Sequence, residues 1–469
     1  MNRFYIFAFS IILSLCSNAI TIDQAKKLYE KGDYAEALSA FKTLLSKSAK
    51  DANLNYYVGR CHYSMNEQDQ SIPYFTFAQS KSIPEASKYL ALIAFDNYEF
   101  EEATEHLETY QLALTKAKKS VPDDFEPFMA RAINANNMLE RVEKIQIIDS
   151  INVDATDFFK FYKISQESGS LNAASILPNG FEAAPYTVVF QPESKSQMMW
   201  ATLNADGKES IVTSAILSDN TWEQPHELNE NINTNNSNYP FIMSDGITLY
   251  FANDGENSIG GYDIFFTRKD EDGFLQPQNI GMPYNSQHND YMLVIDETTG
   301  IGWWASDRNQ IENKVTIYIF IPNETRSNYP ANTPNLINLA KINSIKDSWI
   351  VDADYSEILN KLDEITISAK ANSSKSFTLS LPNGKVYTSI DDFSKQSAAD
   401  AMQEYLDAVK EYNANINHIS ILRKTYSNGD KSVANEIIEI ENKILTQQKI
   451  LTTLRNTVVS LECHEKTDN

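Results

Sequence analysis

The spacing of apolar residues changes twice along the chain, and each change indicates a different kind of structure. From about residue 20 to 145 apolar residues recur at helical spacing, and from about residue 180 they alternate with polar residues as in β-strands. Beyond Gly384 the apolar spacing becomes a heptad. The pattern therefore predicts an α+β multidomain protein with an N-terminal helical region, a central strand region and a C-terminal helical hairpin.

The helical region contains a repeat of about 34 residues. Small residues recur 34 and 32 positions apart, and a bulky residue follows each of them four positions later: Ala37 and Phe41, Ser71 and Phe75, Ala103 and Leu107. A small residue lets two helices approach, and the bulky residue fills the space between them. The period predicts helix-turn-helix units stacked as an α-solenoid, with a further helix at 126–145 capping the last unit.

This pattern resembles the tetratricopeptide repeat over residues 20 to 115. The resemblance implies a concave wall formed by the first helix of each repeat, and the repeat spacing places eight residues on it: Lys26, Tyr29, Asn53, Tyr56, Arg60, Tyr63, Lys88 and Leu92. Tyrosines and basic groups on a strongly acidic protein suggest a groove for an extended or acidic peptide. The alternative is that the tyrosines pack between repeats and the cations are solvated.

The strand region repeats at intervals of 51 to 53 residues. An aromatic residue followed by alanine recurs three times: Trp200-Ala201, Phe251-Ala252 and Trp304-Ala305. Asn233 is matched by Asn285, and each copy reads as three or four short antiparallel strands, which is typical of β-propeller blades. Three copies predict a small or incomplete propeller, for which strands at 144–153 and a hairpin at 376–390 are candidate additional edges.

The second copy contains the glycine-rich stretch SDGITLYFANDGENSIGGYDIFFT at 244–267. We expect Asp245-Gly246 to close a hairpin, because glycine adopts a positive φ at little steric cost, and Gly260-Gly261 to permit tight packing or a bulge. The alternative is a calcium ion held by Asp254, Glu256 and Asp263, whose spacing does not match an EF-hand loop.

The motif SDGITLYFANDG followed by GGYDIF resembles the WD40-like, TolB-type repeat of bacterial envelope proteins. Together with the helical repeats it resembles Bacteroidota envelope proteins, some of which belong to the type IX secretion and gliding machinery. Such proteins often end in an OmpA-like domain, which we do not find here, so peptidoglycan anchoring is not expected. The resemblance implies a scaffold that binds a protein partner.

The C-terminal heptads predict two helices joined by a turn at 426–430. Apolar residues keep the register from Met402 to Ile419 and from Val433 to Leu461, with Gln447 in one apolar site. The two helices are expected to form an antiparallel coiled-coil hairpin that buries its own seam. Alternatively, one seam faces a partner or a second copy of the protein.

The first 19 residues have the pattern of a secretory signal peptide cleaved after Ala19, with a basic residue before an apolar core at 4–15. That core is too short for a membrane anchor, which needs roughly 20 residues. Lipidation at Cys16 is an alternative, although Leu15 stands where that signal peptidase requires a small residue. We expect an exported protein, in the periplasm or associated with the outer membrane, with no transmembrane segment in the mature chain.

Charge and motif content limit the function classes. With 63 acidic and 40 basic residues the formal net charge is −23, which disfavours nucleic acid as a partner. No HExxH, Walker, GxGxxG, CxxC or GxSxG motif occurs, so neither an enzyme nor a cofactor is expected. Two alternatives to a scaffold remain: a carbohydrate-binding propeller using Trp222, Trp303 or Trp304, and a propeller-borne hydrolase or lyase.

These patterns divide the chain into six segments. In order they are a signal peptide (1–19), tetratricopeptide-like repeats with a capping helix (20–145), a WD40-like β-propeller (146–350), a connecting segment with a β-hairpin (351–394), a helical hairpin (395–462) and a polar tail (463–469).

Overall fold

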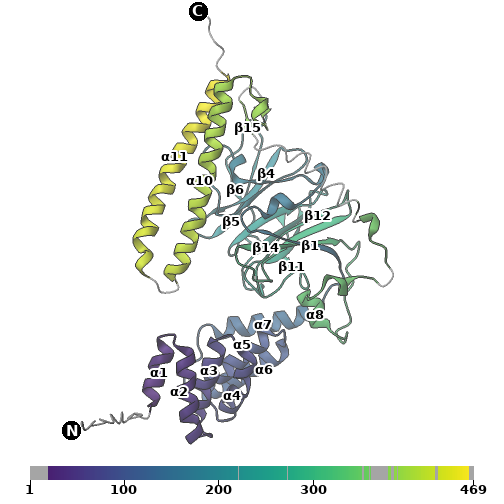
Figure 1. The fold of residues 1–469 in the computed structure, drawn as a ribbon. Coiled ribbons are helices and arrows are strands. Elements are labelled where there is room, and N and C mark those ends of the chain that lie inside the picture. The colour runs from purple at the N-terminus through teal and green to yellow at the C-terminus, as the bar shows by residue number, and fades with distance from the viewer. Residues whose placement is uncertain are drawn as a thin grey trace, which may run out of the picture. The chain divides into compact units, whose positions relative to one another are not determined.

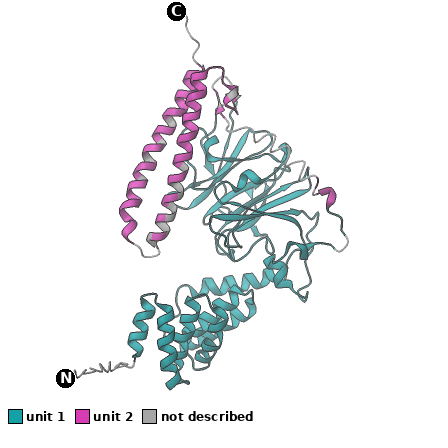
Figure 2. Ribbon diagram, in the orientation of Figure 1, with its two compact units in different colours: residues 1–355 teal, residues 356–469 magenta. Residues whose placement is uncertain are grey.

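The protein is a mixture of helices and antiparallel sheets. The computed structural model describes residues 20–463 apart from 220, 272, 351–352, 359, 361–378, 382–384, 388 and 428–430. The expected signal peptide with Cys16, and the tail beyond residue 463, lie outside the described residues. The chain divides into two compact units, Met1–Tyr355 and Ser356–Asn469 (Figure 2). The expected boundary at 145/146 falls inside the first unit.

Helices open the first unit (Figure 1). Their bounds are α1 (Ile22–Glu30), α2 (Tyr34–Lys47), α3 (Ala52–Ser64), α4 (Gln68–Ser80), α5 (Pro84–Asp96), α6 (Phe100–Lys116) and α7 (Phe125–Leu139), with α8 (Leu336–Lys341) much later in the chain. Local sequence sets several starts: Thr21 and Gln24 form a capping box before α1, and Asp51 accepts a hydrogen bond from the Leu54 amide at α3. The capping helix ends at Leu139, earlier than expected.

The residues that define the 34-residue period lie in the interior of the helical region. The small and bulky residues of the period are all buried: Ala37, Phe41, Ser71, Phe75, Ala103 and Leu107. A Cβ atom on Gly59 of α3 would lie 2.8 Å from the Phe75 ring of α4. The close approach of α3 and α4 therefore depends on the missing side chain at Gly59.

The turn inside each helical pair repeats as well. Gly32, Asn66 and Tyr98 precede α2, α4 and α6, with φ values of +86°, +60° and +66°. Because the left-handed region disfavours most side chains, packing of the flanking helices holds Tyr98 in a conformation that its sequence does not favour.

Strands of the first unit form three antiparallel sheets within the described residues. The first has the order β2 (Ser170–Ala173), β3 (Val188–Gln191), β4 (Gln197–Leu203), β5 (Glu209–Ala215) and β6 (His226–Glu227). The second has β10 (Gly273–Phe274), β9 (Asp263–Asp270), β8 (Thr248–Asn253) and β7 (Ser237–Ile242), with β11 (Gln278–Asn279) also on β9. The third has β1 (Gln146–Asp154), β14 (Lys314–Ile321), β13 (Ile301–Ser306) and β12 (Asp290–Asp296).

Strand β1 comes before the first sheet in the chain but lies in the third. It pairs with β14 from Gln146 opposite Ile321 to Asp154 opposite Lys314. The strand expected at 144–153 therefore does supply a sheet edge. Of the hairpin expected at 376–390, the structure describes β15 (Leu379–Ser380) and β16 (Val386–Tyr387), which pair with each other in the second unit. Residues 376–378, 382–384 and 388 lie outside the described residues.

The recurring asparagines have a structural role. The side chain of Asn233 accepts a hydrogen bond from the Ile211 amide at 2.8 Å and donates one to the Ile211 carbonyl at 3.0 Å. Asn285 makes the same two bonds to Ile264, at 2.8 and 2.9 Å. Each side-chain amide thus pairs with a strand like a neighbouring peptide group, tying a loop to β5 or β9.

The glycine-rich stretch forms turns and a close contact. Asp245 accepts hydrogen bonds from the amides of Ile247 and Thr248, and Gly246 has φ +65°, as a hairpin turn requires. A Cβ atom on Gly260 would lie 2.1 Å from the carbonyl oxygen of His288. The predicted hairpin and tight packing are both present.

Two of the three carboxylates considered for calcium have other partners. Asp254 accepts two hydrogen bonds from Asn236, at 3.0 and 2.8 Å. Asp263 accepts from the amides of Ile259 and Gly260 and from the Asn279 side chain. Asp254 therefore holds the residue before β7, whereas Asp263 holds the loop at 259–260 and β11.

Helices and sheets of the first unit share one hydrophobic cluster. Phe95 of α5 and Phe128 of α7 belong to it together with Ile259 and Met282 from the sheet loops and Leu336 of α8. The Gln287 side chain also donates a hydrogen bond to the Phe95 carbonyl. This packing explains why the first unit extends past the expected domain boundary.

The second unit consists mainly of α10 (Gln396–Ser427) and α11 (Ala434–Cys463), which pack along their length (Figure 1). Ile419 and Leu422 contact Ile440 and Ile444 near the turn, so the helices run antiparallel. At the polar site of the heptad, Asn415 donates a 2.8 Å hydrogen bond to Gln447.

Short 3-10 helices complete the described structure. They are η1 (Phe158–Phe161), η2 (Gln166–Ser168), η3 (Ala174–Ile176), η4 (Ile345–Ser348), η5 (Ile390–Asp392) and η6 (Lys431–Val433).

Candidate functional site

A cationic side chain lies among tyrosines on the N-terminal helices. The guanidinium of Arg60 on α3 is 4.3 Å from the ring centroid of Tyr29 on α1, and 5.6 and 5.8 Å from the rings of Tyr56 and Tyr57. These distances are those of cation–π contacts. The residues follow from helical spacing, because Tyr56, Tyr57 and Arg60 lie within one turn of α3.

The same group continues onto α5 through Tyr89. Its ring centroid is 4.9 Å from that of Tyr63 and 6.2 Å from that of Tyr56. We call Arg60 with Tyr29, Tyr56, Tyr57, Tyr63 and Tyr89 the tyrosine cluster. The repeat spacing missed Tyr89 but selected its neighbour Lys88, an error of one helical position.

Burial and neighbouring rings determine the electrostatics of the cluster. Burial raises the pKa of Tyr56 and of Tyr63, so both phenols stay neutral. Burial alone would lower the pKa of Arg60. The interactions with Tyr56, Tyr89 and Tyr29 together raise the pKa by more than burial lowers it, so the net shift is upward. Arg60 is therefore a permanent cation.

Within the described residues, Arg60 has no acidic partner. Among the residues that the structure describes, no carboxylate forms an ion pair with Arg60, and its buried Nε atom has no hydrogen-bond partner. A guanidinium has five N–H donors that match a carboxylate in pairs. The arrangement can bind a carboxylate while the surrounding rings hold the guanidinium in place.

The other residues expected on the concave wall of the repeats have different surroundings. Lys26 lies 5.1 Å from the Tyr57 ring and so borders the cluster, whereas Asn53 is exposed. Leu92 packs against the hydrophobic cluster of the helices and sheets. Lys88 forms a 2.6 Å ion pair with Asp124 at the start of α7, so its charge has a partner within the helices.

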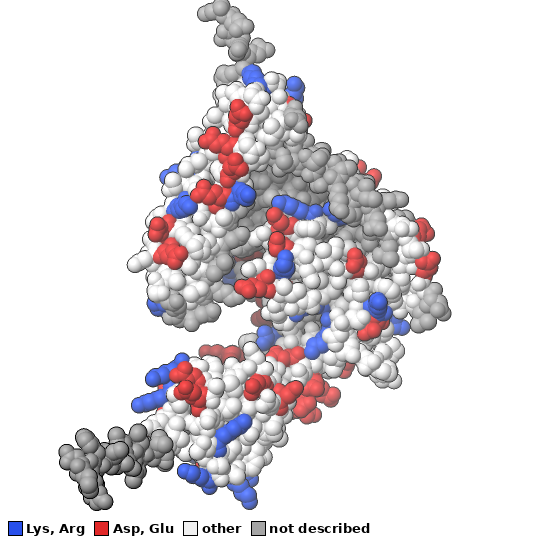
Figure 3. All heavy atoms as spheres, in the orientation of Figure 1, with Lys and Arg blue, Asp and Glu red and all other residues white. Residues whose placement is uncertain are grey.

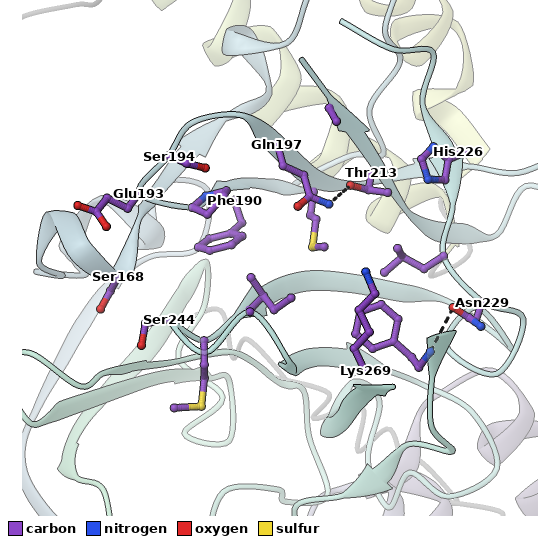
Figure 4. A pocket seen from close by; sticks show the side chains of 18 of the residues that line it. Ser168, Phe190, Glu193, Ser194, Gln197, Thr213, His226, Asn229, Ser244 and Lys269 are labelled. Atoms are coloured by element: carbon purple, nitrogen blue, oxygen red, sulfur yellow. Dashed lines mark hydrogen bonds between the residues drawn. The ribbon is translucent and has the colours of Figure 1, made fainter. Parts of the chain in front are cut away.

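A second candidate site, which the sequence did not indicate, is a cleft of 670 Å³ between the first and second sheets (Figure 4). Its apolar lining includes Phe190, Met199, Ile242 and Phe274. Figure 4 shows Lys269 reaching into the cleft from β9. The volume is typical of small-molecule sites.

The polar groups of the cleft do not converge on one point. Gln197 donates a 2.7 Å hydrogen bond to Thr213 across β4 and β5, and Asn229 accepts one from the Phe274 amide. His226 and Glu193 lie at separate places on the rim (Figure 4). In the described part of the chain, no group of three or more His, Cys, Asp or Glu side chains gathers where a metal ion could bind.

Two of the three tryptophans considered for sugar binding are buried. Trp303 and Trp304 on β13 are fully buried, so their rings cannot stack on a glycan. Trp222 is partly buried and packs against the hydrophobic group that contains Trp200. This corrects the expectation of a sugar platform at Trp303 and Trp304.

Comparisons with known proteins do not assign a family. No protein-family model matches this chain, and no curated protein is similar to it at a significant level. Within the described residues, none of the helices is both long enough and apolar enough to cross a bilayer.

Proposed function

We propose that the protein is a non-enzymatic, exported scaffold of the bacterial envelope that binds an acidic segment of a protein partner at the tyrosine cluster. The observation that carries this proposal is the Arg60 guanidinium, which contacts three tyrosine rings and has no carboxylate partner among the described residues. Aromatic rings and arginine are the residue types that contribute most to protein interfaces.

The finer architecture belongs to the same proposal. We take α1 to α7 as a tetratricopeptide-like solenoid, because the small-residue period and the left-handed turns repeat together. We take the three sheets as blades of a small propeller. The equivalent bonds of Asn233 and Asn285 support this, as does the pairing of β1 with the last sheet, which joins the two ends of the strand region.

Location in the envelope is inferred from sequence. The first 19 residues have the pattern of a signal peptide, and the remaining chain is strongly acidic. A secretion or surface assembly is the setting that the resemblance to Bacteroidota envelope proteins suggests.

The test is crosslinking in the native envelope followed by affinity purification and mass spectrometry. Wild type is compared with Arg60→Gln and with Arg141→Gln, which removes the same charge from an exposed site. We expect one dominant partner crosslinked to α1, α3 or α5, lost in Arg60→Gln and kept in Arg141→Gln. Equal recovery from all three proteins, with unchanged circular dichroism, would exclude the tyrosine cluster as the binding site.

A further inference from the structure

A separate cleft of 550 Å³ lies where the end of α7 meets loops of the strand region, inside the first unit. Asn134, Asn137 and Arg141 line it from the helix side, at spacings of three and four residues that keep side chains on one helix face. The segments around β11 and after β14 form the rest of its lining. Its volume is typical of small-molecule sites, and it shares no residue with the tyrosine cluster.

The lining of this cleft is cationic and rich in amides. Two arginines, Arg141 and Arg326, and six asparagine or glutamine side chains contribute to it, and none of the lining residues is an aspartate or a glutamate. The whole protein has a net charge of −23, and acidic side chains are spread over the face drawn in Figure 3. The cleft therefore differs in charge from the protein as a whole, and an anion is the ligand that complements it.

Arg326 is a fixed part of the cleft wall. Its Nη1 donates a 2.9 Å hydrogen bond to the Ile280 carbonyl, and its Nε donates one of 3.2 Å to the Asn328 side chain. Gly281 leaves room for this guanidinium, because a Cβ atom there would lie 3.3 Å from Nη2. Glu143 lies 3.7 Å from Nε and shares its charge. Arg326 thus supplies a positioned cation, several of whose donors are already used.

Arg141 has donors that can reach a ligand. Its side chain is exposed, and within the described residues its guanidinium takes part in no ion pair or hydrogen bond. The neighbouring acid Glu140 accepts a 3.4 Å hydrogen bond from Asn136 and does not line the cleft. The Arg141 carbonyl accepts a 3.5 Å hydrogen bond from Nη2 of Arg326, so the two arginines are adjacent. A guanidinium presents paired N–H groups that match two oxygens of a carboxylate or phosphate.

Amide groups line the same cleft. In the described part of the chain, the side chains of Asn134, Asn137 and Gln278 form no hydrogen bond. Asn279 is different, because its side chain donates a 2.7 Å hydrogen bond to Asp263 and so has a structural role. A primary amide both donates and accepts, which makes it a suitable partner for a hydroxyl group. Available amides beside an available arginine suit a ligand that has both hydroxyl groups and an anionic group.

We propose that this cleft binds an acidic sugar, a small molecule with ring hydroxyls and one carboxylate or phosphate group. Arg141 pairs with the anionic group, and the charge of Arg326 assists it. Asn134 and Asn137 form hydrogen bonds with the hydroxyls. This binding site goes beyond the proposed scaffold role and does not depend on it.

The experiment is isothermal titration calorimetry at low ionic strength on the full-length chain without its expected signal peptide. The probes are glucuronate, phosphorylated glucose, glucose, acetate and inorganic phosphate. Wild type is compared with Arg141→Gln and with the control Arg268→Gln, which removes the same charge from an exposed position on β9 outside the cleft. Thermal unfolding is measured for each variant.

We expect wild type and Arg268→Gln to bind an acidic sugar about tenfold more tightly than glucose, acetate or inorganic phosphate, because only an acidic sugar uses the arginine and the amides together. Arg141→Gln should weaken that binding about tenfold. The tighter of glucuronate and phosphorylated glucose identifies the anionic group as carboxylate or phosphate. Arg141→Gln should still capture the protein partner of the tyrosine cluster, because the two sites share no residue.

A second variant keeps the test valid if Arg141→Gln has a lowered unfolding midpoint. Asn137→Asp has nearly the same size at an exposed position of α7 and places a negative charge in the cleft. It should weaken the acidic sugars by like-charge repulsion and leave glucose unchanged.

Three results would overturn the proposal. The first is that wild type binds neither acidic sugar. The second is that acetate or inorganic phosphate binds as tightly as the acidic sugars, which would show that the sugar hydroxyls are not recognised. The third is equal weakening by Arg141→Gln and Arg268→Gln, which would show attraction by the overall charge rather than by the cleft. None of these results changes the proposed function, whose test is partner capture at Arg60.

Discussion

The carboxylate of Asp290 forms a 2.7 Å ion pair with the guanidinium of Arg308, and both side chains are almost completely buried. Arg308 also donates a 2.9 Å hydrogen bond to the Pro283 carbonyl, and Asp290 accepts one of 2.6 Å from the Ser286 amide. The pair therefore connects β12 and the end of β13 to the loop that precedes β12.

Removal of Arg308 should destabilise the first unit strongly. Arg308→Met leaves the buried Asp290 carboxylate without its cation, which typically costs about 3–5 kcal/mol. Urea unfolding should show this as a large fall in the transition midpoint. The matched control is Lys314→Gln, which breaks the exposed pair with Asp154 and should cost less than about 1 kcal/mol. Similar losses in the two variants would contradict the prediction.

Asp263 should make stability depend on pH. Burial, together with the charge of Asp290, raises the pKa of Asp263 from 3.8 to about 8. The folded state then holds a proton that the unfolded state has released, so this group stabilises the fold below about pH 4 and loses that contribution as pH rises to about 8.

The measurement is the free energy of unfolding between pH 4 and pH 8 for wild type and Asp263→Asn. Asparagine cannot titrate, so the free energy of unfolding of the variant should fall less steeply with rising pH. The difference in slope should correspond to at most one bound proton. Parallel curves for the two proteins would show that Asp263 is ionised throughout this range in the folded state.

Gly260→Ala should destabilise the protein although alanine is the smallest possible addition. The new Cβ atom would meet the backbone oxygens of His288 and Ser286, which cannot rotate away as a side chain could. We expect a loss of about 1–3 kcal/mol by chemical unfolding. Gly207, with φ +74° and no atom near its Cβ position, is the control, where alanine should cost only about 1 kcal/mol of backbone strain.

The Asn415–Gln447 hydrogen bond should specify the register of α10 against α11. Gln447→Leu leaves the Asn415 amide facing an apolar side chain and should lower stability by about 1 kcal/mol. The double variant with Asn415→Leu should recover that loss but permit other registers or association states. Sedimentation velocity distinguishes a single species from a mixture, and a single species with unchanged stability would contradict this role.

Local patterns predicted the succession of a helical region, a strand region and two C-terminal helices. The small residues at Ala37, Ser71 and Ala103, the hairpin at Asp245-Gly246 and the polar heptad site at Gln447 are all found as the spacing predicts. Each depends on residues near one another in the chain, where periodicity is informative. The propeller, the solenoid and the envelope role stay predictions.

Side-chain partners from distant segments could not be predicted in this way. Helical spacing selected Lys88, which forms an ion pair with Asp124, and missed its neighbour Tyr89, whose ring contacts that of Tyr63. By itself, then, the sequence determined the repeats, turns and heptads, which follow from backbone geometry and local apolar spacing. Only the tertiary structure decided which cations are paired, because ion pairing depends on distances between segments that periodicity does not specify.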